Sequence, residues 1–274
     1  MRFVLLVLIL TFFTSVCKAD YLKATMYLTE GNETKAFEEF LVSAKAGDTS
    51  SQYNVGYMYE EGKGVERNYK KAHYWYKKAA AKKHMKAIHN LGNLYYFGKG
   101  VERKLDTAEM LFKYNSEKGD AESMFNLALI YFEDEKKEYE KAYQWFQKSY
   151  ENGIPKALLF IGICLEDGLG IEANLEKAIE TYKKASREGV HEAETNLGLL
   201  YMQGRTGISQ NCTEALKWAT KAADAGESKS MFNLGLIYQN GCGSVKKDKN
   251  KAKEFYTKAA DKGLTQAKIK LLQL

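Results

Sequence analysis

The apolar positions of this 274-residue chain recur in a pattern with a period close to 36 residues. Six copies align on a central small residue and read NVGYMY, NLGNLY, NLALIY, FIGICL, NLGLLY and NLGLIY, centred on Gly56, Gly92, Ala128, Gly162, Gly198 and Gly235. Successive copies are spaced by 36, 36, 34, 36 and 37 residues. Self-similarity at a fixed period of this length is typical of a solenoid, in which one supersecondary unit is repeated.

The first half of each copy predicts a helix with one small and apolar face. A leucine-like residue precedes the central residue, and an apolar residue and usually a tyrosine follow two and three positions beyond it. These spacings place the side chains on one side of a helix. A small central residue lets a neighbouring helix approach closely, where a leucine would overpack the contact. An Ala or Ser also stands five residues before the centre: Ser51, Ala87, Ser123, Ala157, Ala193 and Ser230.

A glycine-rich turn and a second helix complete each copy. Glycine ends a helix at low cost because it readily adopts the left-handed conformation. The second half has an alanine at a fixed position and is followed by small residues. Gly-x-Gly turns stand at Gly62 and Gly64, Gly98 and Gly100, and Gly168 and Gly170. Aromatic residues follow the fixed alanine, such as Trp75, Phe112, Trp145, Tyr182, Trp218 and Phe255.

These residues resemble the Sel-1-like repeats, close relatives of the tetratricopeptide repeats. The similarity rests on A-x-x-N-LG-x-LY-x-x-G-x-GV in the first half and KA-x-x-WY-x-KAA in the second, and KKAHYWYKKAA from Lys70 to Ala80 is the clearest copy. The resemblance implies an all-α fold, a right-handed α/α superhelical solenoid of helix–turn–helix repeats.

The repeat register predicts the organisation of the whole chain. We expect a signal peptide over residues 1–19, a shortened N-terminal repeat over 20–47 and a C-terminal capping helix over 264–274. Six repeats lie between them, at 48–83, 84–119, 120–153, 154–189, 190–226 and 227–263. In the repeat at 120–153, FEDEKKEYEKA replaces the glycine-rich turn and departs from the pattern.

The first residues predict export. An apolar run from Phe3 to Phe13 is too short to span a bilayer, and small residues follow at Cys17 and Ala19. We expect cleavage after Ala19, a periplasmic or secreted mature protein and no transmembrane anchor. Acylation of Cys17, as in a lipoprotein, is the alternative, although Val16 is bulkier than the residue usual before such a cysteine.

Charge and residue chemistry argue against several classes of function. Loss of Arg2 and Lys18 with the signal leaves 39 basic against 35 acidic residues, a balance too mild to indicate nucleic acid as a partner. Neither the four histidines nor the cysteines show metal-ligand spacing, and each Gly-x-Gly follows a helix instead of a strand. We therefore expect no metal, no cofactor and no phosphate-binding loop.

Two classes of function remain as hypotheses. The first is a non-enzymatic scaffold that binds a protein or peptide in the cell envelope or outside the cell. The second is a weak β-lactamase or penicillin-binding hydrolase, because the chain resembles the secreted, cysteine-rich Sel-1-like repeat proteins described in those terms. A Ser-x-x-Lys runs from Ser244 to Lys247, but its usual Ser-Asp-Asn and Lys-Thr-Gly companions are missing, as are paired cysteines in most repeats. We expect no catalytic residue.

The mature chain has three cysteines with different expected roles. Cys164 takes an apolar position filled by Met58 and Leu94 in other repeats, which predicts an inert core thiol. Cys212 starts a second helix and Cys242 follows the next first helix, and in stacked helical hairpins these two places share one rim. We predict a Cys212–Cys242 disulfide, suited to an oxidising compartment. The alternative is two free thiols, with Cys242 exposed and reactive.

An asparagine lies two residues before the centre in five copies, and Phe160 breaks the series. In tetratricopeptide relatives this position faces the inner groove, where an amide can hold a peptide backbone. The alternative is a structural asparagine that bonds the neighbouring helix in each unit. The five residues are Asn54, Asn90, Asn126, Asn196 and Asn233. If a groove gives specificity, better candidates are the variable neighbours Tyr53, His89, Phe125 and Phe232, together with Tyr57, Asn93 and Tyr96.

Two segments match the N-glycosylation pattern Asn-x-Thr, beginning at Asn32 and at Asn211. Glu30 extends the first segment to the longer bacterial pattern, which has an acidic residue two positions before the asparagine. Asn32 is therefore the glycosylation candidate.

Overall fold

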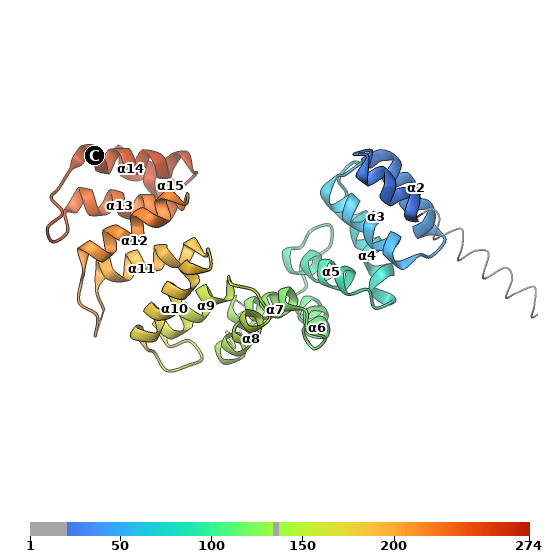
Figure 1. The fold of residues 1–274 in the computed structure, drawn as a ribbon, viewed down its shortest axis with the longest axis horizontal. Helices are drawn as coiled ribbons and strands as arrows, with labels where there is room; N and C mark the ends of the chain where they lie inside the picture. The colour runs from blue at the N-terminus through green and yellow to red at the C-terminus, as the bar shows by residue number, and fades with distance from the viewer. Residues whose placement is uncertain (1–20, 134–136, 206) are drawn as a thin grey trace, which may run out of the picture. The chain divides into compact units, whose positions relative to one another are not determined.

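The computed structural model describes residues 21–133, 137–205 and 207–274 (Figure 1). All regular elements in these residues are helices, apart from two isolated bridges within turns. None of the helices in these ranges is long and apolar enough to cross a bilayer. The expected signal peptide, with Cys17, lies outside the described residues. The chain divides into two compact units, and the boundary between them in the sequence follows Ile130.

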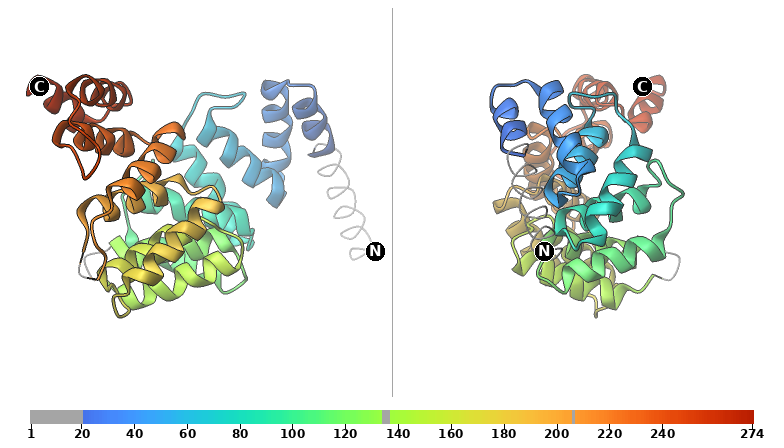
Figure 2. Two further views of the ribbon diagram at one scale, coloured as in Figure 1. Left: turned by 60° about the vertical axis from the view of Figure 1, so that its left-hand side comes forward. Right: turned by 90° about the vertical axis from the view of Figure 1, so that its right-hand side faces the viewer.

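The first unit is a run of helices that pack in chain order. Residues 21–29 are helical and precede α2 (Glu33–Lys45), α3 (Thr49–Glu61), α4 (Tyr69–Ala81), α5 (Met85–Phe97), α6 (Leu105–Ser116) and most of α7 (Ala121–Glu133). From α2 to α6 each helix contacts the next. Short turns join the helices, as Figure 2 shows. The core has Phe40, Met58 and Tyr76 among its buried side chains.

The second unit repeats this arrangement from Tyr131 onward. Its helices are α8 (Tyr139–Glu151), α9 (Ala157–Asp167), α10 (Leu175–Arg187), α11 (His191–Gln203), α12 (Cys212–Asp224), α13 (Ser228–Asn240), α14 (Lys249–Asp261) and α15 (Thr265–Leu272). Consecutive helices again contact one another. The prediction of an all-α repeat solenoid is confirmed.

In four first helices the central glycine lies under an aromatic ring of the following second helix, at Gly56, Gly92, Gly162 and Gly235. A Cβ added at Gly56 would come within 2.6 Å of the Tyr76 ring, and one added at Gly92 within 2.6 Å of the Phe112 ring. The covering residue stands four positions after the fixed alanine and is fully or almost fully buried in all six repeats: Tyr76, Phe112, Phe146, Tyr182, Ala219 and Tyr256. The small residue thus makes room for a ring.

The aromatic residues that the sequence suggests for the second helices therefore occupy two different positions of the repeat. Phe112 and Tyr182 are covering residues, whereas Trp75, Trp145, Trp218 and Phe255 each stand one position earlier. Adjacent side chains on a helix point about 100° apart, so only one of each aromatic pair can lie over the glycine. Ala219 is the exception among covering residues, and there the backbone approaches instead, because a Cβ at Gly198 would lie 3.1 Å from the Ala219 nitrogen.

The Gly-x-Gly turns end helices and also contact the preceding repeat. Gly62, Gly98 and Gly168 adopt the left-handed conformation at the ends of α3, α5 and α9. The second glycine of each turn leaves no space for a side chain: a Cβ at Gly64 would collide with the backbone of Glu33, and one at Gly100 with that of Tyr69. The turn is thereby held against the start of the preceding second helix.

Polar side chains cap most of the second helices. Asn68, Asn174, Asn211 and Asp248 each accept a hydrogen bond from the backbone nitrogen three residues later, at 2.9–3.1 Å. Such caps stabilise a helix by roughly 1 kcal/mol each. Asn32 caps α2 in the same way, with Oδ1 accepting from the Lys35 nitrogen at 3.2 Å. The glycosylation candidate thus has a structural role as well.

Candidate functional site

The A face is the set of side chains that stand three and two residues before, and one and four residues after, the central residue of each first helix. These positions share one side of a helix. They include every asparagine and aromatic candidate taken from the sequence, with contributions from α3, α5 and α7 in the first unit and from α9, α11 and α13 in the second.

Aromatic side chains cluster on the A face of α3. The Tyr53 ring stacks on His84 with centroids 4.8 Å apart, and on Tyr57 with centroids 6.4 Å apart. The Lys63 ammonium donates to the Tyr57 hydroxyl at 3.3 Å. Burial raises the pKa of Tyr53. Because both tyrosines remain partly exposed, they present flat rings and hydroxyls that can contact a bound chain.

Asn90 belongs to a chain of hydrogen bonds that spans three helices. Asn90 on α5 donates to the Tyr76 hydroxyl on α4 at 2.9 Å, and Tyr76 donates to Glu60 on α3 at 2.7 Å. Burial and the adjacent carboxylate raise the pKa of Tyr76, and burial raises that of Glu60. The hydroxyl therefore stays protonated and links two consecutive repeats.

The same arrangement recurs in the second unit. Tyr182 donates to Glu166 at 2.8 Å, and Asn196 on α11 hydrogen-bonds the same hydroxyl. Asn126 has a different partner, because its covering residue is Phe112; it donates to the Asn93 side chain at 2.9 Å. For Asn90, Asn126 and Asn196 the structure thus places the amide in contacts between neighbouring repeats.

Asn54 and Asn233 differ from the other three. Within the described part of the chain, neither side chain has a hydrogen-bond partner. The covering residues that precede them explain this, because Phe40 and Ala219 have no hydroxyl to offer. Both asparagines are partly exposed, so their amides are available to an outside partner.

Phe160, which breaks the asparagine series, belongs to an aromatic cluster. Its ring stacks on Phe146 with centroids 4.7 Å apart, and its edge meets Phe132 at 5.7 Å. Phe132, Phe146 and Phe160 stand at the positions that Glu166, Tyr182 and Asn196 occupy one repeat later. The polar triplet is thus replaced as a whole by an apolar one.

Phe125 and Phe232 differ in their exposure to solvent. Phe125 is only 8% exposed, which is too little for it to select a partner as the sequence suggested. Phe232 is partly exposed, with its ring centroid 5.4 Å from that of Tyr256. The Phe232 ring packs against α14, because the position before the asparagine turns toward the following second helix.

His89 connects two repeats in the first unit. Its Nδ1 lies 2.9 Å from the Ser123 hydroxyl and 3.5 Å from the Asp120 carboxylate, which caps α7 by accepting from the Ser123 nitrogen at 2.9 Å. The hydrogen bond from His89 lowers the pKa of Asp120 from 3.8 to about 2. A matching contact in the second unit joins Ser230 to Thr195 at 2.8 Å.

We predict that Asp120→Asn weakens acid sensitivity. A carboxyl group whose pKa is lower in the folded state adds stability that is complete above its ordinary value and is lost as pH falls toward about 2. The stability difference between wild type and Asp120→Asn, up to about 1 kcal/mol at neutral pH, should shrink between pH 4 and 2. Urea unfolding across this range measures it. Asp48→Asn, at an equivalent cap without a histidine bond, is the control, and a constant difference would refute the prediction.

A buried carboxylate forms a second polar network in the second unit. Glu194 on α11 is completely buried and accepts from Ser186 at 2.6 Å, with the Lys221 ammonium 2.9 Å and His191 Nδ1 3.1 Å away. Burial alone would raise the pKa of Glu194, but these hydrogen bonds outweigh it, so the pKa is lowered. The network ties α10, α11 and α12 together.

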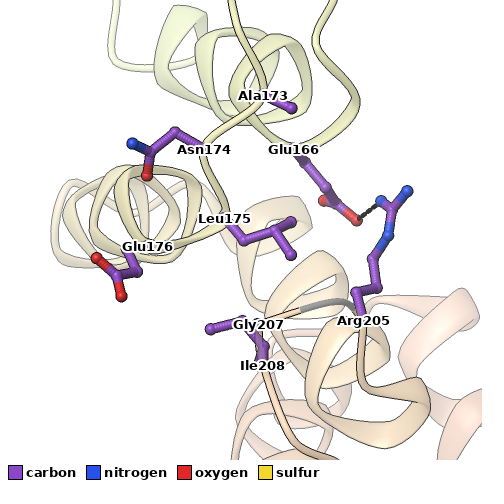
Figure 3. Close-up of a pocket in the computed structure, with 8 residues that line it drawn as sticks. All are labelled: Glu166, Ala173, Asn174, Leu175, Glu176, Arg205, Gly207 and Ile208. Carbon is purple, nitrogen blue, oxygen red and sulfur yellow. Dashed lines mark hydrogen bonds and ion pairs between the residues drawn. The ribbon is translucent and has the colours of Figure 1, made fainter.

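A pocket of about 440 Å³ lies at the turn after α11, where a close contact between repeats is lost (Figure 3). A Cβ on Gly207 would meet no atom within 4 Å, so this turn stands away from the start of α10. Leu175 and Ile208 point into the opening, and Arg205 on its edge pairs with Glu166 at 3.0 Å. The Arg205 guanidinium is therefore already paired, with Glu166 and with Asp167 at 2.8 Å.

The cysteines take the places described from the sequence, and the structure joins Cys212 to Cys242 in a disulfide with a Cα–Cα distance of 5.5 Å. Gly243 leaves room for it, since a Cβ there would lie 3.4 Å from Cys212. Cys164 is buried and free, and burial raises its pKa to about 12, as expected of an unreactive thiol. Among residues 21–133, 137–205 and 207–274, no three His, Cys, Asp or Glu side chains gather as metal ligands would.

Comparison with known proteins places these features in a family. The sequence model of the Sel1 repeat matches six segments, at residues 49–84, 86–120, 121–154, 155–190, 191–227 and 228–264. The chain is 41% identical over 70 residues to the chitin synthase regulator SKT5 of Saccharomyces cerevisiae. This match covers 26% of the chain and only 10% of the yeast protein.

Two crystal structures of bacterial proteins share the fold. A protective antigen of uropathogenic Escherichia coli strains with an SLR fold is 31% identical, with a TM-score of 0.74 over 93% of this chain and 56% of that one. A Sel1 repeat protein from Oxalobacter formigenes is 26% identical, with a TM-score of 0.77 over 88% of this chain and 96% of that one.

Proposed function

Because the chain belongs to the Sel1 repeat family, whose members are typically scaffolds for protein interaction, we propose that it is an exported, non-enzymatic scaffold. Each of its two units holds an extended peptide or protein segment on its own A-face residues. Asn54 and Asn233 carry this proposal, because their amides lack the internal partners that occupy Asn90, Asn126 and Asn196. An amide offers both a donor and an acceptor, as the backbone of an extended peptide requires.

The aromatic cluster on α3 supports the same role in the first unit. Tyr53 and Tyr57 lie on the same helix as Asn54, at partly exposed positions. Tyrosine contributes much contact area at low conformational cost, which makes it frequent among the residues that dominate binding energy. The Lys63 ammonium beside Tyr57 adds one positive charge to this surface.

Export and the absence of catalysis complete the proposal. The N-terminal apolar segment supports export through a signal cut after Ala19, and the Cys212–Cys242 bond suits an oxidising compartment. Mass spectrometry of the mature protein should give a chain beginning at Asp20. Nitrocefin turnover that a substitution at Ser244 or Lys247 abolished would contradict the non-enzymatic part.

Crosslinking in envelope extracts tests the binding role. We expect the mature chain to retain a defined partner, and Asn54→Ala or Tyr57→Ala to weaken its binding roughly tenfold, the effect of losing about 1.4 kcal/mol. Asn152→Ala is the matched control, because this exposed asparagine on α8's C-terminal end bonds only the Lys148 carbonyl. Equal binding of the partner by wild type and all three variants would show that the partner does not bind the A face.

A further inference from the structure

A second, largely apolar pocket lies in the first unit, between α4 and α6, and is lined by none of the A-face residues. Its volume is about 450 Å³, enough for one or two bulky side chains. Ile88 and Leu91 on α5 are buried beneath it, at 4% and 5% exposure. Met110 and Tyr114 on α6 form one wall, and Lys77 and Lys83 stand on the opposite side.

The outer surface beside this pocket is apolar where the second unit is polar. Met110 is 63% exposed, and Tyr74, at the equivalent position of α4, is 51% exposed. The same position in the four second helices of the second unit is polar in each case: Gln144, Glu180, Lys217 and Glu254. Exposed apolar side chains next to a pocket are typical of an interaction surface.

Lys83 is held in a backbone conformation that strains a lysine. Its φ is 63°, in the left-handed region that favours glycine. Every equivalent position is a glycine with positive φ: Gly47, Gly119, Gly153, Gly189, Gly226 and Gly263. A non-glycine residue kept at such a position points to a use for its side chain.

The segment that forms α4, α5 and their flanking turns is strongly positive. Residues 67–101 contain nine lysines and arginines and no aspartate or glutamate. Within the part of the chain that the structure describes, neither the Lys77 nor the Lys83 ammonium pairs with a carboxylate. A basic surface with no internal counterion is complementary to an acidic partner.

From these observations we propose that the pocket between α4 and α6 binds an acidic peptide segment. A bulky apolar side chain of the segment enters the pocket over Ile88 and Leu91, and flanking carboxylates meet Lys77 and Lys83. The pocket belongs to the first unit and shares no lining residue with the A face. This inference does not rest on the proposed function.

An acidic peptide fits this site better than an anionic membrane. A membrane-binding face carries a broad apolar stripe that sinks into lipid, whereas here the apolar atoms line a recess. A recess over buried side chains selects a protruding group of matching shape. Binding to vesicles is therefore an outcome that would count against the proposal.

Peptide selection on the purified mature chain tests the proposal. We expect short random peptides displayed on phage to be enriched in Asp and Glu around a Leu, Met or Phe. In fluorescence anisotropy, the labelled winning peptide should bind Met110→Glu roughly tenfold more weakly than wild type. It should bind Lys83→Gly about two- to fivefold more weakly, and added salt should weaken binding further.

The Tm of Lys83→Gly gives a second measurement, which distinguishes a binding role of Lys83 from a purely structural one. Because glycine relieves the strain, its Tm should rise by about 2–4 °C while binding falls. Lys70→Gln is the matched control, since it removes one exposed charge of the same basic run without lining the pocket. It should leave binding within about twofold of wild type.

Several outcomes would overturn the proposal. They are winning peptides without acidic enrichment, no enrichment at all, equal binding by wild type and Met110→Glu, or stronger binding to phosphatidylserine vesicles than to the peptide. Asn54→Ala keeps the two proposals apart, because it removes an A-face amide and should leave the acidic peptide's affinity unchanged.

Discussion

Replacing Tyr182 with alanine should lower the free energy of unfolding by about 3–5 kcal/mol. The ring is completely buried over Gly162, and its hydroxyl bonds Glu166 and Asn196 on two other helices. Truncation leaves a cavity between three helices and removes the shared partner of two polar groups. Chemical denaturation of the mature protein measures the loss.

Two variants separate packing from hydrogen bonding at this position. Tyr182→Phe keeps the ring and matches the natural Phe112 and Phe146, so it should cost only about 1–2 kcal/mol for the lost hydrogen bonds. Tyr150→Ala, at a partly exposed tyrosine that bonds Glu188, is the control and should cost less than Tyr182→Ala. A loss at Tyr182 no larger than at Tyr150 would contradict a ring-over-glycine core.

The fifth repeat shows why the chain itself tolerates an alanine at this position. Ala219 covers Gly198, and the backbones approach until a Cβ on Gly198 would lie 3.1 Å from the Ala219 nitrogen. The neighbouring Trp218 is 9% exposed and donates to Glu214 at 2.8 Å. A single substitution at Tyr182 does not bring the helices together in this way, so its cavity remains open.

The second large effect is expected from the disulfide. It closes a loop of 30 residues, and the chain-entropy estimate for such a loop is about 3–4 kcal/mol. The double variant Cys212→Ser, Cys242→Ser should lose stability of this order, and reductant should lower the Tm of wild type but leave that of the variant unchanged. Thermal denaturation with and without dithiothreitol measures both.

Thiol counting provides the control for this prediction. The denatured mature protein should titrate one thiol, that of Cys164, before reduction and three afterwards. A Tm that does not respond to reductant in wild type, together with three thiols before reduction, would show that the bond does not form in the isolated protein.

The sequence predicts the repeat and its helices because their signals are local. A small central residue and a fixed alanine recur every 34–37 residues, and a glycine-rich turn follows most of the first helices. Each of these signals acts within one or two helical turns. The side chain that covers the glycine was harder to identify, because Trp75 and Tyr76 are adjacent aromatics and both are buried. Only the position of the next helix decides which ring lies over Gly56.

The role of the asparagines could not be read from their spacing alone. Whether an amide is bound depends on a hydroxyl 14 residues earlier, as in Asn90 and Tyr76, and the residue at that place changes from repeat to repeat. Lys83 did leave a signal in the sequence, since it interrupts a column of glycines that ends the other second helices. A departure from a repeated glycine was a better guide to a distinctive surface than the repeated asparagine.

The triplet of Glu60, Tyr76 and Asn90 begins in one repeat and ends in the next. A duplicated or recombined segment that is cut between repeats therefore separates a hydroxyl from its amide. A segment that runs from the middle of one first helix to the middle of the next keeps all three residues of such a triplet together. Chimeras of this protein should accordingly be destabilised by a junction that separates Tyr76 from Asn90, and less by one in the middle of a first helix.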